Sequence, residues 1–224
     1  MTLISFIIPT INEVDNIEPT IFKIHKSMSL VHLGIYEIIF VDNNSSDGTK
    51  TKILSQKEVI LINSDLRKGL GYDLILASNK AKGKFICFLD CDMSIDYLDL
   101  VKILKAINEK TVVIGSRYIS GSVINGSTLV KKIGSFLLNY IIKIIYNINA
   151  IDLSHSLRVF PNFDLNKIQD YKHPAFFWSL SRYHNKLGYT FKEIPITFNE
   201  RMMGDSKNHL FDLLKTSFKY LTTR

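Results

Sequence analysis

The sequence predicts an α/β fold in which helices flank a mostly parallel central sheet. Five short apolar runs recur in the first half of the 224 residues, at 3–8, 36–41, 59–62, 85–89 and 112–114. They are rich in β-branched residues and almost uninterrupted by polar ones, which is typical of parallel strands buried on both faces. Segments with helical signals separate them, and this alternation predicts a doubly wound sheet.

The connecting segments carry recognisable helix boundaries. Asn16 can cap a helix that ends near Leu30, and Asp47 can cap one that ends near Ser55. A third helix is expected after Gly71, ending at Gly83. The glycine pair around Leu70 does not follow the first strand and lacks a third glycine at the right spacing, so a dinucleotide site is not expected.

One long helix is predicted in the second half, over residues 127–148. Its polar side chains fall at every fourth position and form one stripe: Lys131, Ser135, Asn139, Lys143 and Asn147. The wide apolar face beside this stripe suits either packing on the protein's own sheet or a membrane interface, and both interpretations stay open. A second amphipathic stretch closes the chain, with one apolar face predicted at Leu210, Leu214, Phe218 and Leu221.

Composition narrows the class of protein. Hydrophobic residues make up 46% and charged residues 22%, as in a folded globular protein, and the net charge of +7 suits an anionic partner. No nucleic-acid-binding signature is present, so no nucleic acid is expected as a partner. No apolar run reaches 18 residues and no signal-peptide pattern opens the chain, so neither a spanning helix nor secretion is expected. Cys87 and Cys91 lie too far apart along one strand for a disulfide, which fits a cytosolic protein.

The residues that carry chemistry follow the predicted strands. Ligands of doubly wound sheets bind at the carboxyl ends of the strands, and polar segments stand there at 9–13, 42–46, 90–92 and 115–117. Asp90 and Asp92 would share one side of the chain, where two carboxylates can bind Mg²⁺ or Mn²⁺ and, through it, a diphosphate. Taken alone, an Asp-x-Asp segment also occurs wherever a strand runs into a turn.

The order of these motifs resembles the family 2 glycosyltransferases, and within them the dolichol-phosphate mannose synthase-like enzymes that load sugars onto polyprenyl phosphate. The segments that carry the resemblance are 8–13, 41–49, 89–92, 115–118, 152–158 and 201–207. The resemblance implies a GT-A (Rossmann-like) fold in a single catalytic domain over 1–224. Its nucleotide-sugar and metal-binding half would be 1–118, and its acceptor-binding half would be 119–224.

The resemblance also implies roles for individual residues. Those expected to bind the nucleotide sugar are Pro9, Ile11, Glu13, Val41, Asp42, Asn43, Asp90, Cys91, Asp92, Arg201 and Lys207. The expected metal ligands are Asp90, Asp92 and Ser94, and the acceptor phosphate is expected at Arg117, Lys131 and Ser135. The residues expected to take part in catalysis are Asp90, Asp92, Arg117 and Asp152.

Three departures from the family pattern bear on the substrates. Ile11 stands where the family commonly has Tyr, and Asn43 where it commonly has Asp, so the donor, GDP-mannose or a UDP-sugar, stays open. His155-Ser156-Leu157 replaces the usual Ser-Gly-Phe on the acceptor side.

The expected function is metal-dependent, inverting transfer of a sugar from a nucleotide-diphosphate sugar to a polyprenyl or dolichyl phosphate. A phosphate monoester is already an anion at neutral pH, so no general base is needed. The protein is expected at the cytoplasmic membrane face, bound peripherally to the membrane surface. The alternatives are a glycosyltransferase of the same fold that acts on a saccharide or protein hydroxyl, and an inactive nucleotide-sugar-binding module.

Overall fold

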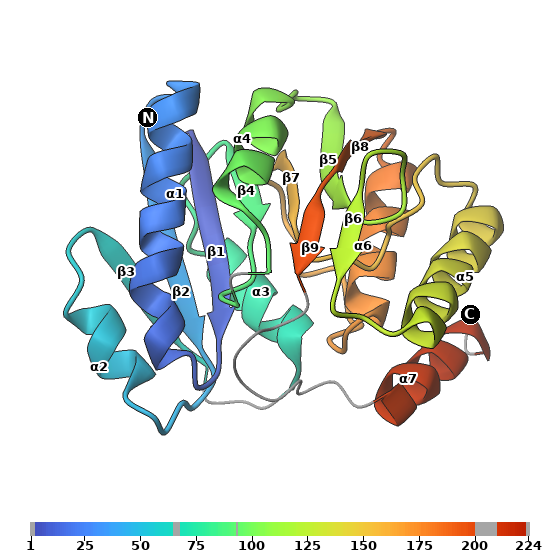
Figure 1. The fold of residues 1–224 in the computed structure, drawn as a ribbon, viewed down its shortest axis with the longest axis horizontal. Coiled ribbons are helices and arrows are strands. Elements are labelled where there is room, and N and C mark those ends of the chain that lie inside the picture. Colours follow the sequence, from blue (N-terminus) through green and yellow to red (C-terminus); the bar gives the residue numbers. More distant parts are fainter. Residues whose placement is uncertain (1–2, 65–67, 93, 200–209, 223–224) are drawn as a thin grey trace.

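The computed structural model describes residues 3–64, 68–92, 94–199 and 210–222, with the side chains of 210–214 left aside (Figure 1). Seven strands form a central sheet. In sheet order they are β3 (Val59–Asn63), β2 (Tyr36–Asp42), β1 (Ile4–Thr10), β4 (Phe85–Phe88), β7 (Arg158–Pro161), β5 (Thr111–Ser116) and β8 (Thr190–Pro195). All neighbouring strands are parallel except β7, which is antiparallel to β4 and β5. The predicted α/β fold with a mostly parallel sheet is confirmed.

All five predicted strands are present within one or two residues of their expected bounds. The sheet also contains β7 and β8 from the second half of the chain, so strands of both halves share one sheet. Two further short strands, β6 (Val123–Asn125) and β9 (Thr197–Asn199), pair with each other in parallel beside the main sheet.

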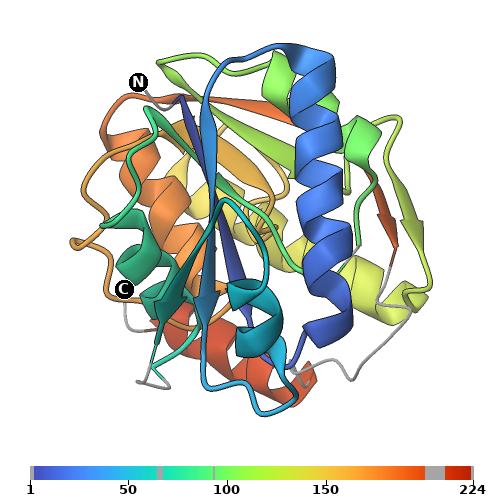
Figure 2. The same cartoon turned by 90° about the vertical axis from the view of Figure 1, so that its left-hand side faces the viewer.

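Helices cover both faces of the sheet (Figure 2). Against one face pack α1 (Ile17–Val31), α2 (Thr49–Leu54) and α4 (Tyr97–Lys105), with the short 3-10 helix η1 (Val14–Asn16) leading into α1. Against the other pack α3 (Leu70–Ser78), α5 (Leu129–Tyr146), α6 (Ala175–Lys186) and α7 (Leu210–Thr222). Along β1, Phe6 and Ile8 enter the first core while Ile7 enters the second, which explains the uninterrupted apolar run in the sequence.

The predicted helix boundaries are partly right. Asp47 accepts the backbone N–H of Thr49 at 3.0 Å, at the first residue of α2. Asn16 stands at the N-cap position of α1 but makes no capping hydrogen bond, and its side-chain amide nitrogen donates to Glu13 at 2.7 Å. The third helix begins at Leu70 and ends at Ser78, five residues before Gly83.

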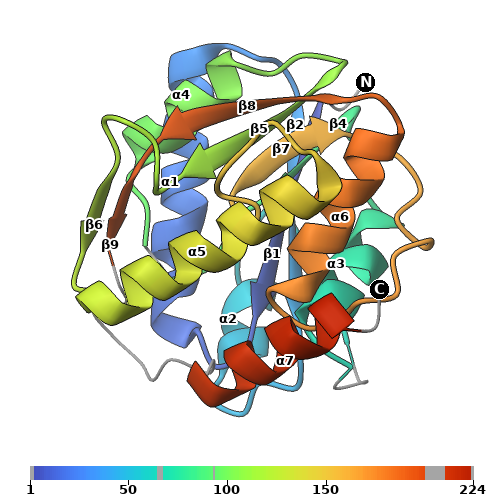
Figure 3. The ribbon, with the colours of Figure 1, turned by 90° about the vertical axis from the view of Figure 1, so that its right-hand side faces the viewer.

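The long helix α5 lies along the outside of the molecule (Figure 3), and only the middle of its polar stripe is buried, since Lys131 and Asn147 at the two ends of the stripe are exposed. Asn139, in the middle of the stripe, is 1% exposed, whereas Val130 is 75% and Ile144 62% exposed. The interpretation that α5 packs on the protein's own sheet holds for one side of the helix, where Ile142 is buried and Leu138 and Tyr146 pack against the core, but most of the wide apolar face is not covered. That face is uncovered over several turns, and its exposed members are Leu129, Val130, Ile133, Leu137, Tyr140, Ile141, Ile144 and Ile145.

The last helix, α7, also differs from expectation. Phe218, assigned to its apolar face, is 70% exposed, while Tyr220 is buried against Trp178 of α6. The side chains of Leu210 and Leu214 lie outside the described part. In the described ranges, no helix combines the length and apolar character that crossing a membrane requires.

Candidate active site

Two segments that follow β1 and β2 bind each other at the carboxyl edge of the sheet. The backbone N–H of Asn12 donates to Ser45 Oγ at 2.9 Å, and the N–H of Ser46 donates to Asn12 Oδ1 at 2.9 Å. A further pair joins Val14 N–H to Asp47 at 3.1 Å. These bonds satisfy backbone groups that no strand or helix uses, so the two segments form one rigid wall.

The predicted nucleotide residues of β1 and β2 line this wall at different depths. Pro9 is half-buried and Ile11 is 37% exposed, whereas Glu13 is buried. Val41 belongs to the hydrophobic core, so its side chain does not face a ligand. Asp42 is fully buried and accepts the N–H of Ser45 at 3.1 Å, which fixes the start of the second segment.

Asn43 contacts a carboxylate that the sequence analysis did not single out. Its side-chain amide donates to Asp73, in the first turn of α3, at 2.8 Å. Ser64 donates to the other carboxylate oxygen of Asp73 at 2.5 Å. Burial raises the pKa of Asp73, and the two hydrogen bonds oppose that rise. The signal that could have identified Asp73 from the sequence is a charged residue on the buried side of a short helix.

Asp90 and Asp92 occupy the segment that follows β4. Both are half-buried; Asp90 accepts a hydrogen bond from Ser156, and Asp92 accepts the backbone N–H of Ser94 at 3.1 Å. The Ser94 side chain is itself buried. Cys91 points into the core beside Thr20, and burial raises the pKa of its thiol to about 12, so it stays neutral.

The two carboxylates fit a divalent cation whose remaining ligands are supplied by a substrate. In the described residues, no group of three or more His, Cys, Asp or Glu side chains could hold a metal ion alone. Mg²⁺ characteristically uses one or two carboxylates together with substrate phosphates and water, so a larger protein cage is not required. Asp90 and Asp92 would be the protein ligands of such a cation.

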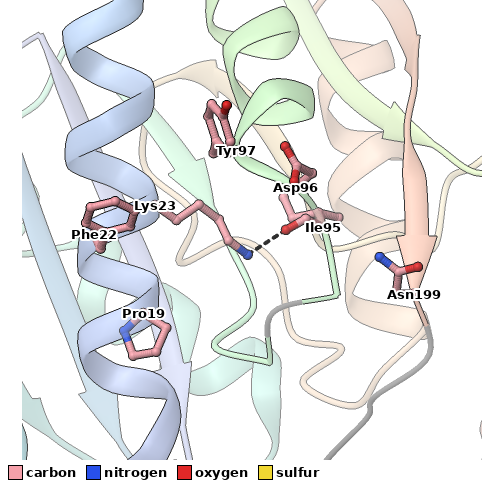
Figure 4. A pocket seen from close by; sticks show the side chains of 7 residues that line it. All are labelled: Pro19, Phe22, Lys23, Ile95, Asp96, Tyr97 and Asn199. Atoms are coloured by element: carbon pink, nitrogen blue, oxygen red, sulfur yellow. Dashed lines mark hydrogen bonds between the residues drawn. The ribbon is translucent and has the colours of Figure 1, made fainter.

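A buried lysine supports the same segment from the side of α1. Figure 4 shows a pocket lined by Pro19, Phe22, Lys23, Ile95, Asp96, Tyr97 and Asn199. Lys23 is buried, and its ammonium donates to the carbonyl oxygen of Ile95 at 2.6 Å. Burial lowers the pKa of Lys23, while Asp92 and Asp96 act in the opposite direction. Lys23 therefore ties the segment after Asp92 to α1 and places a positive charge close to it.

Arg117 is held in a fixed orientation by Asp152. Nε and Nη2 of Arg117 donate to the two carboxylate oxygens at 2.8 Å each, and its backbone N–H donates at 2.9 Å. Nη2 also donates to Ser154 at 3.2 Å. Burial alone lowers the pKa of Arg117, but the facing carboxylate outweighs it and the pKa is raised, so the guanidinium stays charged. Among the described residues Nη1 has no partner, which leaves it available to an anion.

Helix α5 lies close to this arginine. Tyr118, the residue after Arg117, packs edge-on against Phe136 at 5.6 Å between ring centroids, and Asn139 donates to Ser154, which also accepts from Arg117. Ser135 is half-buried and precedes Phe136 in this helix. Lys131 is exposed one turn earlier on the same helix. Arg201 and Lys207 lie outside the described residues.

The segment that carries Asp152 is scaffolded by groups the sequence analysis did not assign. Glu193 of β8 accepts the backbone N–H groups of Ile151 and Asp152 at 2.8 and 2.9 Å. Arg158 is fully buried and donates to the carbonyl oxygens of His155 and Leu153, and burial lowers its pKa to about 9. An arginine inside an otherwise apolar strand was the signal for this role.

A mostly parallel sheet with paired aspartates at the end of β4 is typical of a GT-A fold. The chain belongs to glycosyl transferase family 2, whose model matches residues 5–169. It is 28% identical to a dolichol-phosphate mannosyltransferase of Pyrococcus furiosus, over 97% of this chain and 61% of the relative. It is 25% identical to a polyprenol monophosphomannose synthase of Mycolicibacterium smegmatis, over 95% and 83%.

A solved structure supports the fold. Glucosyl-3-phosphoglycerate synthase from Mycobacterium tuberculosis, in complex with Mg²⁺ and uridine diphosphate, superposes with a TM-score of 0.68. The sequences are 17% identical, and the superposition covers 99% of this chain and 78% of that one. The chain spans less than two thirds of the length of the Pyrococcus relative and 38% of a Haloferax volcanii hexosyltransferase to which it is 29% identical.

Proposed function

We propose that this chain transfers a sugar from a nucleoside diphosphate to a polyprenyl phosphate at a membrane surface, with inversion at the anomeric carbon. The carrying observation is the position of Arg117: Asp152 fixes its guanidinium, Nη1 is available, and Ser154 links it to α5, the helix with the uncovered apolar face, by accepting from Arg117 at 3.2 Å and from Asn139 at 2.9 Å. The names of the two mannosyl-transferring relatives support this acceptor class.

In the proposed reaction an acceptor phosphate oxygen forms a bond to the anomeric carbon. The bond from that carbon to the diphosphate breaks, and its electron pair leaves with the nucleoside diphosphate. A divalent metal on Asp90 and Asp92 would offset the charge of that leaving group. The acceptor oxygen is already an anion, so the protein has to position it rather than deprotonate it. Arg117, with Lys131 and Ser135, would hold that anion.

The membrane part of the proposal rests on α5. A soluble acceptor gives no reason for eight exposed apolar side chains on one helix, whereas a lipid surface would cover them. The net charge of +7 adds attraction to anionic lipids such as those of the cytoplasmic leaflet. We therefore propose peripheral attachment to the cytoplasmic membrane face through α5.

The acceptor is tested by sugar transfer in the presence of Mn²⁺, from UDP-sugars and GDP-mannose, to a short polyprenyl phosphate. Arg117→Lys keeps the charge but loses the bidentate geometry, so acceptor efficiency should fall about ten- to hundredfold while donor binding changes little. Arg182→Lys, at an arginine that stacks on Tyr146 of α5, is the matched control. Transfer to a saccharide hydroxyl but not to the lipid phosphate would overturn the proposal in favour of the hydroxyl-acceptor alternative.

The membrane surface is tested by sedimentation with anionic liposomes. Ile144→Ser, in the uncovered face of α5, should release a large part of the bound protein. Leu54→Ser is the control, because Leu54 is 71% exposed but lies on α2, on the opposite side of the sheet. Equal release by both variants would remove α5 as the attachment surface.

A further inference from the structure

Asn43 and Asp73 form a buried amide–carboxylate pair at the carboxyl end of β2. They are 6% and 3% exposed, and Asn43 Nδ2 lies 2.8 Å from Asp73 Oδ2. The other carboxylate oxygen accepts from Ser64. A carboxylate accepts hydrogen bonds and does not donate them, so Asn43 must turn its NH₂ group toward Asp73. The orientation of the Asn43 amide is thereby fixed.

The fixed amide presents one acceptor and one donor to a ligand. Among the described residues, Asn43 Oδ1 has no hydrogen-bond partner, and it is not one of the fully buried side-chain atoms that lack one. Oδ1 therefore reaches the surface. Of the two Nδ2 hydrogens, Asp73 uses one. The negative charge of Asp73 also polarises the amide and makes Oδ1 a stronger acceptor.

Asn43 lies where a base would lie if the diphosphate is held at Asp90 and Asp92, a step that rests on the proposed function. Strand β2 is separated from β4 by β1 alone. Neighbouring strands are about 4.8 Å apart, so the end of β2 is about 10 Å from the end of β4. A nucleoside diphosphate spans a distance of this order between its phosphates and its base.

We propose that Asp73 is a positioning residue that makes this site select uridine diphosphate over guanosine diphosphate. Uracil presents one ring N–H beside a carbonyl oxygen, which matches the acceptor and donor of the Asn43 amide. Guanine presents a ring N–H between a carbonyl oxygen and an amino group, and the ring N–H and the amino group are two adjacent donors that match the two oxygens of a carboxylate. Opposite the amide, guanine can pair its ring N–H and carbonyl oxygen as uracil does, but its amino donor is then left without a partner. We expect about a tenfold or greater preference for uridine diphosphate.

The test exchanges the two side chains in the full chain. The double variant N43D/D73N keeps the total charge, and the amide placed at position 73 can donate to the carboxylate placed at position 43 and accept from Ser64. The internal hydrogen bonds are thereby kept, but a carboxylate now faces the ligand. Calorimetric titrations with uridine and guanosine diphosphate, each with Mn²⁺, give the ratio of the two dissociation constants. The ratio should move toward guanosine diphosphate by about tenfold in N43D/D73N. The single variant D73N frees the Asn43 amide to flip and should narrow the preference for uridine diphosphate over guanosine diphosphate.

The ratio separates positioning from a merely structural role. A structural role would weaken both nucleotides equally and leave the ratio unchanged, which would overturn the inference. Ser78→Ala is the control for general disturbance of α3, because the Ser78 hydroxyl donates to Leu74 of its own helix. This variant should keep the wild-type ratio. Thermal unfolding checks that each variant folds. Wild type that binds guanosine or cytidine diphosphate as tightly as uridine diphosphate would refute the inference and leave the proposed function standing. Binding of no nucleotide would refute both.

Discussion

Lowering the pH from 7 to 5 should cost the folded protein about 6 kcal/mol through three histidines, His155, His173 and His184. His155 is 5% exposed, His184 is not exposed at all, and His173 is half-buried. Burial lowers the pKa of His155 and of His184 to about 3 and that of His173 to about 4, with Arg117 adding to the effect at His155 and His173 and Arg158 at His184. All three imidazoles therefore stay neutral in the folded protein throughout this pH range.

The sign follows from proton binding in the two states. An unfolded histidine has a pKa near 6.5, so below that pH the unfolded chain binds protons that the folded chain does not. Stability is then highest above about pH 6.5 and falls as the pH drops toward 3. Between pH 7 and 5 each site contributes about 2 kcal/mol to this loss. Domains are typically stable by about 5–15 kcal/mol, so the loss is a large share.

Urea unfolding followed by circular dichroism at pH 7 and pH 5 measures this loss. His184 packs among Phe160, Phe163 and Tyr189, so His184→Phe suits its surroundings and should reduce the loss by about 2 kcal/mol, to about 4 kcal/mol. His32→Asn, at an exposed position, is the control and should leave the loss near that of wild type. A wild-type loss under about 1 kcal/mol, or a loss that His184→Phe leaves unchanged, would refute the reasoning.

Two further predictions compare a buried charged contact with an exposed one in urea unfolding. Asp152→Asn should lower the free energy of unfolding by about 3–5 kcal/mol, because it leaves the buried guanidinium of Arg117 without its counter-charge. Its control, Glu109→Gln in an exposed ion pair, should change the free energy of unfolding little. Lys23→Met should lower the free energy of unfolding by about 1.5–3 kcal/mol, because it removes a charged hydrogen bond to a buried carbonyl. Its control is Lys26→Met, which should cost clearly less because the Lys26 ammonium rests on the ring of Tyr97. Equal losses within either comparison would contradict the assigned contact.

The sequence by itself determined the sheet and the edge at which ligands bind. Strands buried on both faces must be apolar throughout, so the five runs were visible without any knowledge of their neighbours. The residue types that stop such runs, including Asp90 and Asp92, then mark the carboxyl ends of the strands. These features depend on a few consecutive residues, which is why local patterns identify them. The short strands β7 and β9 escaped notice because three or four residues carry too little periodicity.

Only the tertiary structure decided which groups meet. Asp152 reaches Arg117 across 35 residues, and Asp73 reaches Asn43 across 30, so no spacing rule connects either pair. Periodicity likewise placed the polar residues of α5 on one stripe but did not show which side of the helix is buried. Asn139 faces inward because its side chain donates to Ser154 at 2.9 Å and accepts from Trp178 at 3.1 Å, partners supplied by distant segments, whereas Lys131 and Asn147 of the same stripe are exposed. A buried polar group is stable only where such partners exist, and their positions are set by how the helices and the sheet pack together.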